Sequence, residues 1–345
     1  MTPTFSILIN NFNYAIYLRQ CIDSALGQTW GLKEVIVVDD GSSDDSREII
    51  SSYGGQIYAV YKPNGGQGSA LNEGFKRATG SIIIFLDADD LLKPAALETI
   101  APVMNPGVSK IQFRLSVIDE TGNPLKAVLP TAAMKCGDEK KLLARFGVYT
   151  SPPGSGNAYA KVFLNAVLPM PVKEWKIAAD AYLIFSAPFY GDIITINKEL
   201  GCYRRHGKGA SDINFFGKNS LKEFVDKELV KESLVRKYAA SLLKKHDAQY
   251  SEFKHLSPFC AKYYLIEKRL NAQTISCIAY FRLLASVVAS YLFWPGYTLK
   301  QKFNRVVWAL VIGLAPITVV VYLSSVSLLP HLRANNCKWS KPKRK

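Results

Sequence analysis

Residues 81–94, SIIIFLDADDLLKP, place three acidic residues directly after an apolar run. Residues 82–86 are all large and apolar, which predicts a strand buried in a sheet. Asp87, Asp89 and Asp90 follow within four positions. Carboxylates this close repel one another, and burying one without a partner is costly. Either this end of the strand is a solvated turn, or a positively charged group completes it.

The stretch belongs to a series of alternating strands and helices. Apolar, β-branched runs predict strands at residues 6–10, 34–40, 57–62 and 81–86. Helical spacing and helix-start residues predict helices at residues 14–28, 42–53 and 65–80. This order predicts an α/β fold with a mostly parallel sheet and helices on both faces. Because ligands of such sheets bind beyond the carboxyl ends of the strands, four segments should meet in one crevice: residues 10–13, 39–41, 64–68 and 87–90.

The pair Asp87 and Asp89 has the chemistry of a divalent-cation site. Mg²⁺ and Mn²⁺ prefer oxygen ligands and keep open positions for the phosphates of a substrate. The alternative is a solvated turn, because Asp is common in loops. Two carboxylates one residue apart do not decide between these readings without further motifs.

Two further loops carry ligand-binding features. In VVDDGSSDDS, residues 37–46, Asp39 and Asp40 precede the glycine and suit the ribose hydroxyls or base edge of a nucleotide. In NGGQGSALNEG, residues 64–74, glycines before a helix allow a ligand to approach the backbone or a pyrophosphate to bind the helix N-terminus. Ordinary turn chemistry is the alternative. The loop lacks the Walker A pattern and the spacing of a dinucleotide-binding fingerprint.

Four motifs in this order, SILINNFNYAIYLRQCIDSALGQTW, VVDDGSSDDS, NGGQGSALNEGF and FLDADD, resemble the family 2 inverting glycosyltransferases of the GT-A fold. The resemblance covers residues 4–210. It implies a nucleotide-sugar lying across the strand ends, with a divalent metal, Mn²⁺ or Mg²⁺. The donor contacts that it implies are Asn10, Phe12, Asp39, Asp40, Gly68 and Asp87, and the metal contacts are Asp87 and Asp89. Phe12 stands where the family often has Tyr, which keeps the ring and loses the hydroxyl.

The resemblance also implies residues on the acceptor side. In AADAYLIF, residues 178–185, Asp180 matches the catalytic base, although Ala179 replaces the Glu that commonly precedes it; a helix N-cap is the alternative role of Asp180. SGNAY resembles the acceptor-side loop, with Gly156 and Asn157 as contacts. CYRRHGKGAS resembles the closing segment, in which Arg205 offsets leaving-group charge and His206 assists the metal.

The chain lacks the Q-x-x-R-W signature of the processive members, which favours transfer of a single sugar. UDP is the commonest carrier in the family. Two other functions stay open. The broken Glu-Asp pair would suit a non-catalytic nucleotide-sugar-binding scaffold of a glycan assembly complex. A nucleotidyltransferase that makes the sugar donor would instead open with a Gly-rich, Arg-containing loop after the first strand.

The charge is divided unevenly along the chain, whose net charge is +15. Residues 1–219 hold 22 basic and 21 acidic residues, whereas residues 220–345 hold 21 and 7, and no acidic residue follows Glu267. Residues 306–330 contain no charge over 25 positions, a length that could cross a bilayer. The tail therefore predicts a membrane partner rather than nucleic acid.

These features predict a catalytic domain at residues 1–218, a helical extension at 219–272 and membrane-associated helices with a basic tail at 273–345. A single crossing, a hairpin with residues 275–294, and an interfacial helix followed by a re-entrant segment bent at Pro316 are the possible topologies; the third is favoured. We expect the catalytic part on the cytosolic side, where nucleotide-sugars occur, with a glycan or lipid-linked acceptor. The six cysteines show no C-x-x-C or zinc spacing and indicate reduced thiols, and residues 1–10 do not read as a signal peptide.

Overall fold

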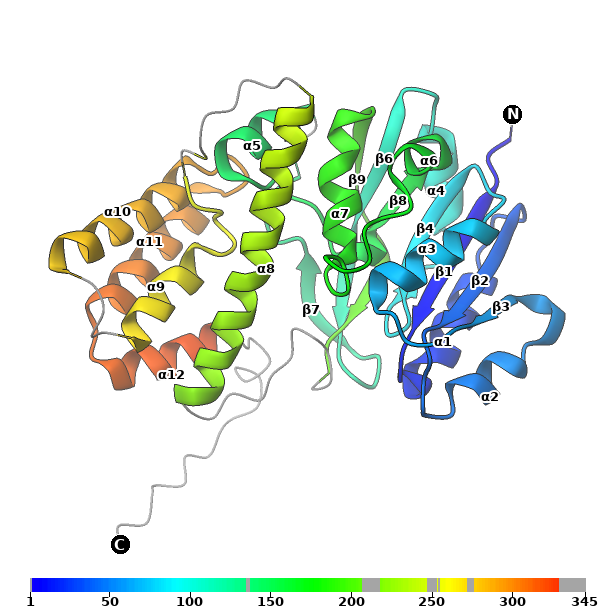
Figure 1. Ribbon diagram of the computed structural model, residues 1–345, viewed down its shortest axis with the longest axis horizontal. Helices are drawn as coiled ribbons and strands as arrows, with labels where there is room; N and C mark the ends of the chain where they lie inside the picture. The colour runs from blue at the N-terminus through cyan, green and yellow to red at the C-terminus, as the bar shows by residue number, and fades with distance from the viewer. Residues whose placement is uncertain are drawn as a thin grey trace, which may run out of the picture. The chain divides into compact units, whose positions relative to one another are not determined.

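The computed structural model describes residues 2–134, 137–206, 218–246, 253, 255–271 and 276–328. The chain divides into two compact units (Figure 1). The first is Met1–Arg205 with Leu234–Phe253, and the second is His206–Ser233 with Lys254–Lys345. The long helix α8 (Lys218–Lys245) therefore contributes its two halves to different units.

The first half of the sheet in the first unit is parallel, as the sequence predicts. Its strands lie in the order β3-β2-β1-β4 and are β1 (Phe5–Asn11), β2 (Lys33–Asp39), β3 (Tyr58–Tyr61) and β4 (Ile82–Asp87). The register of β1 places Asn10 beside Asp87 of β4 and Asn11 beside Asp39 of β2. Polar side chains from three strands are thus brought to one edge of the sheet.

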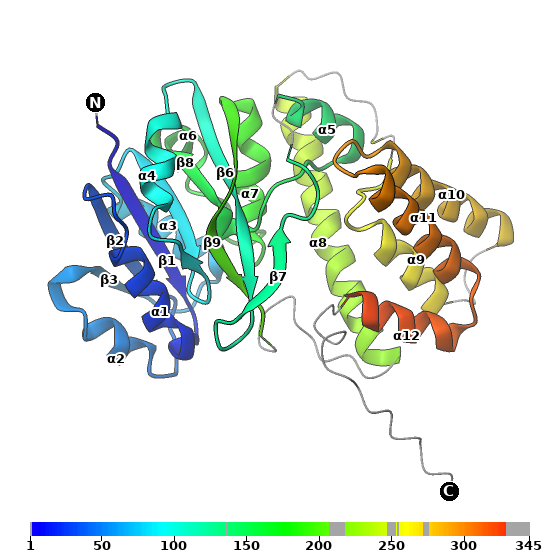
Figure 2. The same cartoon turned by 180° about the vertical axis from the view of Figure 1, so that it is seen from behind.

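Helices cover both faces of this parallel half. They are α1 (Ala15–Leu26), α2 (Ser46–Ser51), α3 (Gln67–Arg77) and the short α4 (Ala96–Ile100). Figure 1 shows α3 in front of the sheet and Figure 2 shows α1 and α4 in front of the opposite face. Side chains of β1 alternate accordingly: Ile7 and Ile9 join the core cluster of α1, whereas Leu8 would lie 2.6 Å from a Cβ on Gly74 of α3. Gly74 is needed because α3 lies this close to the strand.

The second half of the sheet is mixed, so the prediction of a mostly parallel sheet holds only in part. The order continues from β4 as β8-β6-β9-β5, and β7 pairs with β6. These strands are β5 (Leu91–Leu92), β6 (Val108–Ile118), β7 (Pro124–Leu129), β8 (Asn157–Ala160) and β9 (Asp192–Arg204). β8 runs antiparallel to both β4 and β6, while β6 and β9 are parallel. The change of direction arises in a Pro/Gly/Ser segment whose four-residue strand shows no apolar run in the sequence.

The remaining helices of the first unit lie near the second half of the sheet. They are α5 (Glu139–Phe146), α6 (Lys161–Val167) and α7 (Ala179–Ser186), with 3₁₀ turns at Gly54–Gln56, Ala101–Val103, Gly154–Gly156 and Ala187–Phe189. The second half of α8 packs on α7, where the rings of Tyr238 and Tyr182 stack with centroids 4.9 Å apart.

The second unit is helical. Besides the first half of α8 it contains α9 (Ala261–Leu270), α10 (Cys277–Phe293), α11 (Leu299–Leu314) and α12 (Ile317–Leu328). The uncharged run at residues 306–330 is not one helix, because the chain turns extended at Ala315 before Pro316, which cannot continue a helix. Within the described residues, no helix has the length and apolarity needed to span a bilayer.

Candidate functional site

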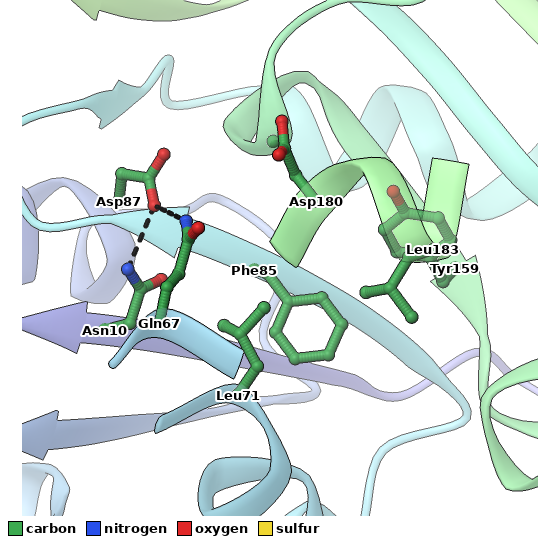
Figure 3. A pocket seen from close by; sticks show the side chains of 9 residues that line it. Asn10, Gln67, Leu71, Phe85, Asp87, Tyr159, Asp180 and Leu183 are labelled. Atoms are coloured by element: carbon green, nitrogen blue, oxygen red, sulfur yellow. Dashed lines mark hydrogen bonds between the residues drawn. The ribbon is translucent and has the colours of Figure 1, made fainter. Parts of the chain in front are cut away.

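The site is built on the carboxyl edge of the parallel strands, where Asp87 ends β4. Its Oδ1 accepts hydrogen bonds from Asn10 Nδ2 at 3.0 Å and Gln67 Nε2 at 3.3 Å (Figure 3). Its backbone N–H donates to Ser155 Oγ at 3.1 Å. Asp87 is therefore held from the first strand, from the glycine-rich loop and from the loop that precedes β8.

The acidic turn concentrates negative charge. Loss of solvent around Asp87, together with the negative charge of Asp89, raises the pKa of the Asp87 carboxyl from its usual 3.8 to about 7. The same causes, burial first and then the charges of Asp89 and Asp87, raise the pKa of Asp90 well above its usual range. A group of carboxylates with this mutual repulsion favours a bound cation.

A buried arginine that the sequence analysis overlooked fixes this turn. The Arg204 backbone N–H donates to Asp90 Oδ1 at 2.9 Å, and its Nε donates to the Asp89 carbonyl at 2.8 Å. Its guanidinium lies over the ring of Tyr17, 4.9 Å from the centroid. Asp90 thus has a structural role at β9. In the sequence, Arg204 is indistinguishable from the neighbouring Arg205.

Asp180 lies in the first turn of α7, on the other side of the pocket. The N-cap of α7 is Ala178, with no side-chain cap hydrogen bond, so Asp180 is not the N-cap of this helix. Its Oδ1 accepts from the backbone N–H of Ala181 at 2.9 Å. Ala178 has a φ of 55°, a left-handed conformation that is strained for alanine and that sets the direction of the helix start.

Asp87 and Asp180 face one pocket, which is also lined by Asn10, Gln67, Leu71, Phe85, Gly154, Tyr159 and Leu183 (Figure 3). A Cβ on Gly154 would lie 3.7 Å from Asp87 Oδ2 and 3.8 Å from Asp180 Oδ2. The two carboxylates therefore point at the same space over Gly154. Figure 3 shows Asn10, Gln67 and Asp87 together on one side, Asp180 across from them, and Leu71 and Phe85 between them and Leu183.

Gln67 joins the two sides of the pocket. Its Nε2 donates to Asp87, and its Oε1 accepts from the backbone N–H of Ala179 at 3.0 Å. One side chain therefore couples the acidic strand end to the start of the helix that carries Asp180. The sequence analysis singled out the glycines around Gln67 and not Gln67 itself. A polar residue between two loop glycines could have indicated its role.

The glycines of this loop are required by close packing within the protein. A Cβ on Gly66 would come 2.8 Å from the Lys176 carbonyl, and one on Gly68 would come 2.5 Å from the Trp175 carbonyl. Gly66 also has a φ of +84°. The close approach of residues 175–176 thus requires glycine at both positions. The contact of Gly68 with a nucleotide stays a prediction.

The acids after β2 are buried and engaged. Asp40 accepts from the backbone N–H groups of Gly65 at 3.0 Å and Gly66 at 2.7 Å, and it forms an ion pair with Lys62. Asp39 accepts from Asn11 Nδ2 at 3.0 Å. Both carboxylates shape the edge on which a nucleotide is predicted to lie, and their direct contact with it stays a prediction. Phe12 directly follows β1 and is 45% exposed, and its contact with the donor stays a prediction.

The loop before β8 is held by a buried polar chain. Asn157 Nδ2 donates to the carbonyls of Pro153 at 2.9 Å and Gly154 at 3.2 Å. Its Oδ1 accepts from Ser151 Oγ at 3.2 Å, and that hydroxyl accepts in turn from Lys110 Nζ at 2.9 Å. Asn157 therefore fixes the position of Gly154 in the pocket, and its predicted acceptor contact stays untested.

Lys110 is a second residue that the sequence analysis missed. It is completely buried in β6, and its ammonium donates to the uncharged Gln112 Oε1 at 3.0 Å and to Ser151. Burial lowers the pKa of Lys110 to about 7, against the attraction of Glu139 and Asp180. The other predicted glycine, Gly156, is packed within the loop, because a Cβ there would meet the Pro152 side chain at 2.6 Å.

Arg205 and His206 are the last two residues of the described range 137–206. The Arg205 backbone N–H donates to the Ile118 carbonyl at 2.9 Å. His206 is buried and is the first residue of the second unit. Neither is among the residues lining the pocket. Residues 207–211 of the predicted closing segment lie outside the described residues, so the roles of Arg205 and His206 stay predictions.

The donor atoms of the acidic turn suit a hard cation with few protein ligands. Among the residues that the structure describes, no group of three or more His, Cys, Asp or Glu is placed to hold a metal ion. The chain offers the carboxylates of Asp87 and Asp89 together with Asn10 Oδ1, a buried oxygen without a hydrogen-bond partner in the described chain. This set fits Mg²⁺ or Mn²⁺ only if phosphate and water supply the other ligands.

Comparisons with known proteins agree with this geometry. The family description "Glycosyl transferase family 2" matches residues 6–146. An uncharacterized glycosyltransferase of Nostoc sp. is 36% identical over 208 residues, 59% of this chain and 65% of that protein. One of Rickettsia prowazekii is 40% identical over 132 residues, 37% of this chain and 42% of that protein. The chain thus spans less than two thirds of the length of either relative.

One solved structure shows the same fold. TarS of S. aureus, crystallised with UDP-GlcNAc, superposes with a TM-score of 0.53 at 13% identity, covering 90% of each chain. At this identity the likeness concerns the fold alone. The four parallel strands and the acidic turn thus lie in the part of the chain that matches glycosyltransferase family 2.

Proposed function

We propose that the protein transfers one sugar from a nucleoside-diphospho-sugar to a hydroxyl of an acceptor, with inversion at the anomeric carbon. The observation that carries this proposal is the pair of carboxylates, Asp87 and Asp180, that point at one space over Gly154 from opposite elements. An inverting displacement needs charge stabilisation for the leaving group on one side of the sugar and a base on the other.

Asp87 and Asp89 form the side for the leaving group. A divalent cation held there would act as a Lewis acid for the departing diphosphate. Asn10 and Gln67 fix the Asp87 carboxylate through hydrogen bonds to Oδ1, which leaves Oδ2 directed to the pocket. The site therefore presents a preorganised oxygen rather than a mobile side chain.

Asp180 forms the base side. Its carboxylate takes the proton of the acceptor hydroxyl while the acceptor oxygen bonds to the anomeric carbon and the bond from that carbon to the diphosphate oxygen breaks. The hydrogen bond between Gln67 and the N–H of Ala179 sets the distance between base and leaving-group side. Ala179, which stands in place of the Glu of the family pattern, is buried.

The sugar donor and the cellular location are proposed here as classes. A UDP-sugar is the donor to test first, since UDP is the commonest carrier in the family and TarS was crystallised with UDP-GlcNAc. The acceptor is a glycan or a lipid-linked glycan at the cytosolic face of a membrane. The cationic second unit, described below, supports this location.

The test is to offer UDP-, GDP- and dTDP-sugars with Mn²⁺ or Mg²⁺ to the full chain and to identify the released phosphate compound. A transferase releases nucleoside diphosphate from one donor, and the Asp89→Asn variant does not. Release of pyrophosphate would indicate a nucleotidyltransferase. Donor binding without any release, over a panel of glycan and lipid-linked acceptors, would indicate the scaffold.

A further inference from the structure

The outer face of α11 has an apolar stripe. Leu299, Phe303, Val307, Leu310 and Leu314 recur every three or four residues and are 85%, 67%, 42%, 41% and 66% exposed. The buried residues of the same helix are Ala309, Ile312 and Gly313. The helix therefore exposes most of its large apolar side chains and buries only one of them, Ile312, the reverse of a helix on the surface of a protein in water.

The neighbouring helix α10 also exposes large apolar side chains. Figures 1 and 2 both show α10 beside α11, and Tyr280 OH of α10 donates to the Gly313 carbonyl of α11 at 2.8 Å. The exposed large apolar residues of α10 are Ile278, Phe281, Leu292 and Phe293. Exposed large apolar side chains gathered on two neighbouring helices mark an interaction site.

Only positive charge accompanies these stripes. Residues 276–328 contain four basic residues and no acidic one: Arg282, Lys300, Lys302 and Arg305. Lys302 Nζ donates to the Leu292 carbonyl at 2.6 Å, and the Arg305 guanidinium lies 4.2 Å from the ring centroid of Tyr297. Two of the four cations, Lys302 and Arg305, are therefore held against α10 and the loop that joins α10 to α11.

We propose that the exposed stripes of α10 and α11, here called the outer helix face, dock on an anionic phospholipid surface with both helices lying in the interface. Large apolar side chains beside cations match the boundary between acyl chains and anionic headgroups. A second copy fits less well, because each copy would present four cations of residues 276–328 without an acidic partner. Nucleic acid fits less well because the stripe on α11 is mostly aliphatic and cannot stack on bases.

This inference concerns where the proposed transfer takes place and in that sense rests on the proposed function, but its test needs no sugar donor. The full chain is sedimented with vesicles of phosphatidylcholine alone or with about one third phosphatidylglycerol. We expect partition onto the anionic vesicles that falls in high salt. The double variant Leu299→Asp, Phe303→Asp should lower this partition at least about tenfold.

Val162→Asp is the matched control, because Val162 is 82% exposed on α6 of the first unit and lies outside the pocket. It should leave partition unchanged. Lys300→Glu, which keeps the stripe, should lower partition onto anionic vesicles and spare the fold, as measured by circular dichroism. The inference is overturned if the wild-type chain does not partition, if it prefers neutral vesicles, or if Val162→Asp matches the double variant. It is also overturned if the double variant instead dissociates a dimer in size-exclusion chromatography with light scattering.

Discussion

The acidic turn at residues 87–90 and the segment around Lys110 place charge of opposite sign near one pocket. In the turn, loss of solvent and the charge of Asp89 raise the pKa of Asp87 to about 7. In β6, burial lowers the pKa of Lys110 to about 7, and both its hydrogen-bond acceptors in the described chain are uncharged. An ion pair between the Lys110 ammonium and a carboxylate of the acidic turn would stabilise both groups, yet the hydrogen bonds of Lys110 go to uncharged groups.

The two regions differ in whether a ligand can reach the charged groups. The acids face open space over Gly154, where a ligand can neutralise them. Lys110 has no exposure and is linked by hydrogen bonds to Ser151 and, through it, to Asn157, which hold the loop. Perturbed ionisable groups of this kind cluster at functional sites because they lower stability and must be kept for another reason.

The largest expected effect is that of Asp180→Asn. Removing a general base should lower the turnover number by about 10²- to 10⁴-fold, since the acceptor proton then has no carboxylate to receive it. Donor binding, measured by calorimetry, should change little because Asp180 lies across the pocket from Asp87. Turnover within threefold of the wild type would remove Asp180 from the base role.

The next effect is on stability, in Lys110→Met. The unfolded chain has a lysine pKa of 10.5, and the folded pKa is about 7. Between these values the unfolded state binds more protons, so wild-type stability rises with pH across this window, and below pH 7 the full cost of the buried charge remains. The free energy of unfolding, measured with urea, should therefore be higher in the variant than in the wild type. This difference should be about 2–4 kcal/mol larger at pH 6 than at pH 10.

Lys198→Met, at an exposed position of β9, is the control for this experiment, and its difference from wild type should not vary with pH. If the Lys110→Met difference were equally constant, the ammonium would not be buried as the structure has it.

A smaller stability effect is expected from Asp89→Asn in the metal-free protein. Because the folded pKa of Asp87 lies above its usual 3.8, the folded state binds more protons between pH 4 and 7, and stability falls as pH rises through this window. Removing the charge of Asp89 should raise the free energy of unfolding by about 1–2 kcal/mol at pH 8 and by little at pH 4. Mn²⁺ with UDP should raise the melting temperature of the wild type but not of this variant, and an equal rise in both would exclude Asp89 as a ligand.

The smallest effect is that of Gly154→Ala. The added methyl would lie 3.3 Å from Asp180 Cβ, within the space that both carboxylates face. We expect kcat/KM to fall about three- to tenfold with an unchanged melting temperature. Gly55→Ala, where an added Cβ meets nothing within 4 Å, should leave both quantities unchanged.

The parallel half of the fold and its acidic edge could be predicted from the sequence. The apolar runs at 6–10, 34–40 and 81–86 are long and β-branched, and parallel order alone brings Asn10 and Asp87 to one edge. The mixed half could not be predicted, because β8 has four residues and lies in a Pro/Gly segment. The break in the uncharged run at 306–330 falls at Pro316, the residue at which the sequence predicted a bend.

Individual side chains of the site were predicted less well than the elements. Lys110 in a strand suggests a solvent-facing position by alternation, but β6 lies between β8 and β9 and is covered on both faces. Gln67 and Arg204 act through hydrogen bonds to backbone groups distant in sequence. Such contacts depend on tertiary register, which a single sequence does not reveal.

If Asp87 and Asp180 lie on opposite sides of the transferred sugar, as proposed, one displacement inverts the anomeric carbon. The most direct measurement follows the sugar product of an α-linked UDP-sugar by ¹H NMR from the first minutes of the reaction, with an acceptor or with water. We expect the β-anomer to form first. An α-anomer as the first product would show retention and contradict the assigned roles of the two carboxylates.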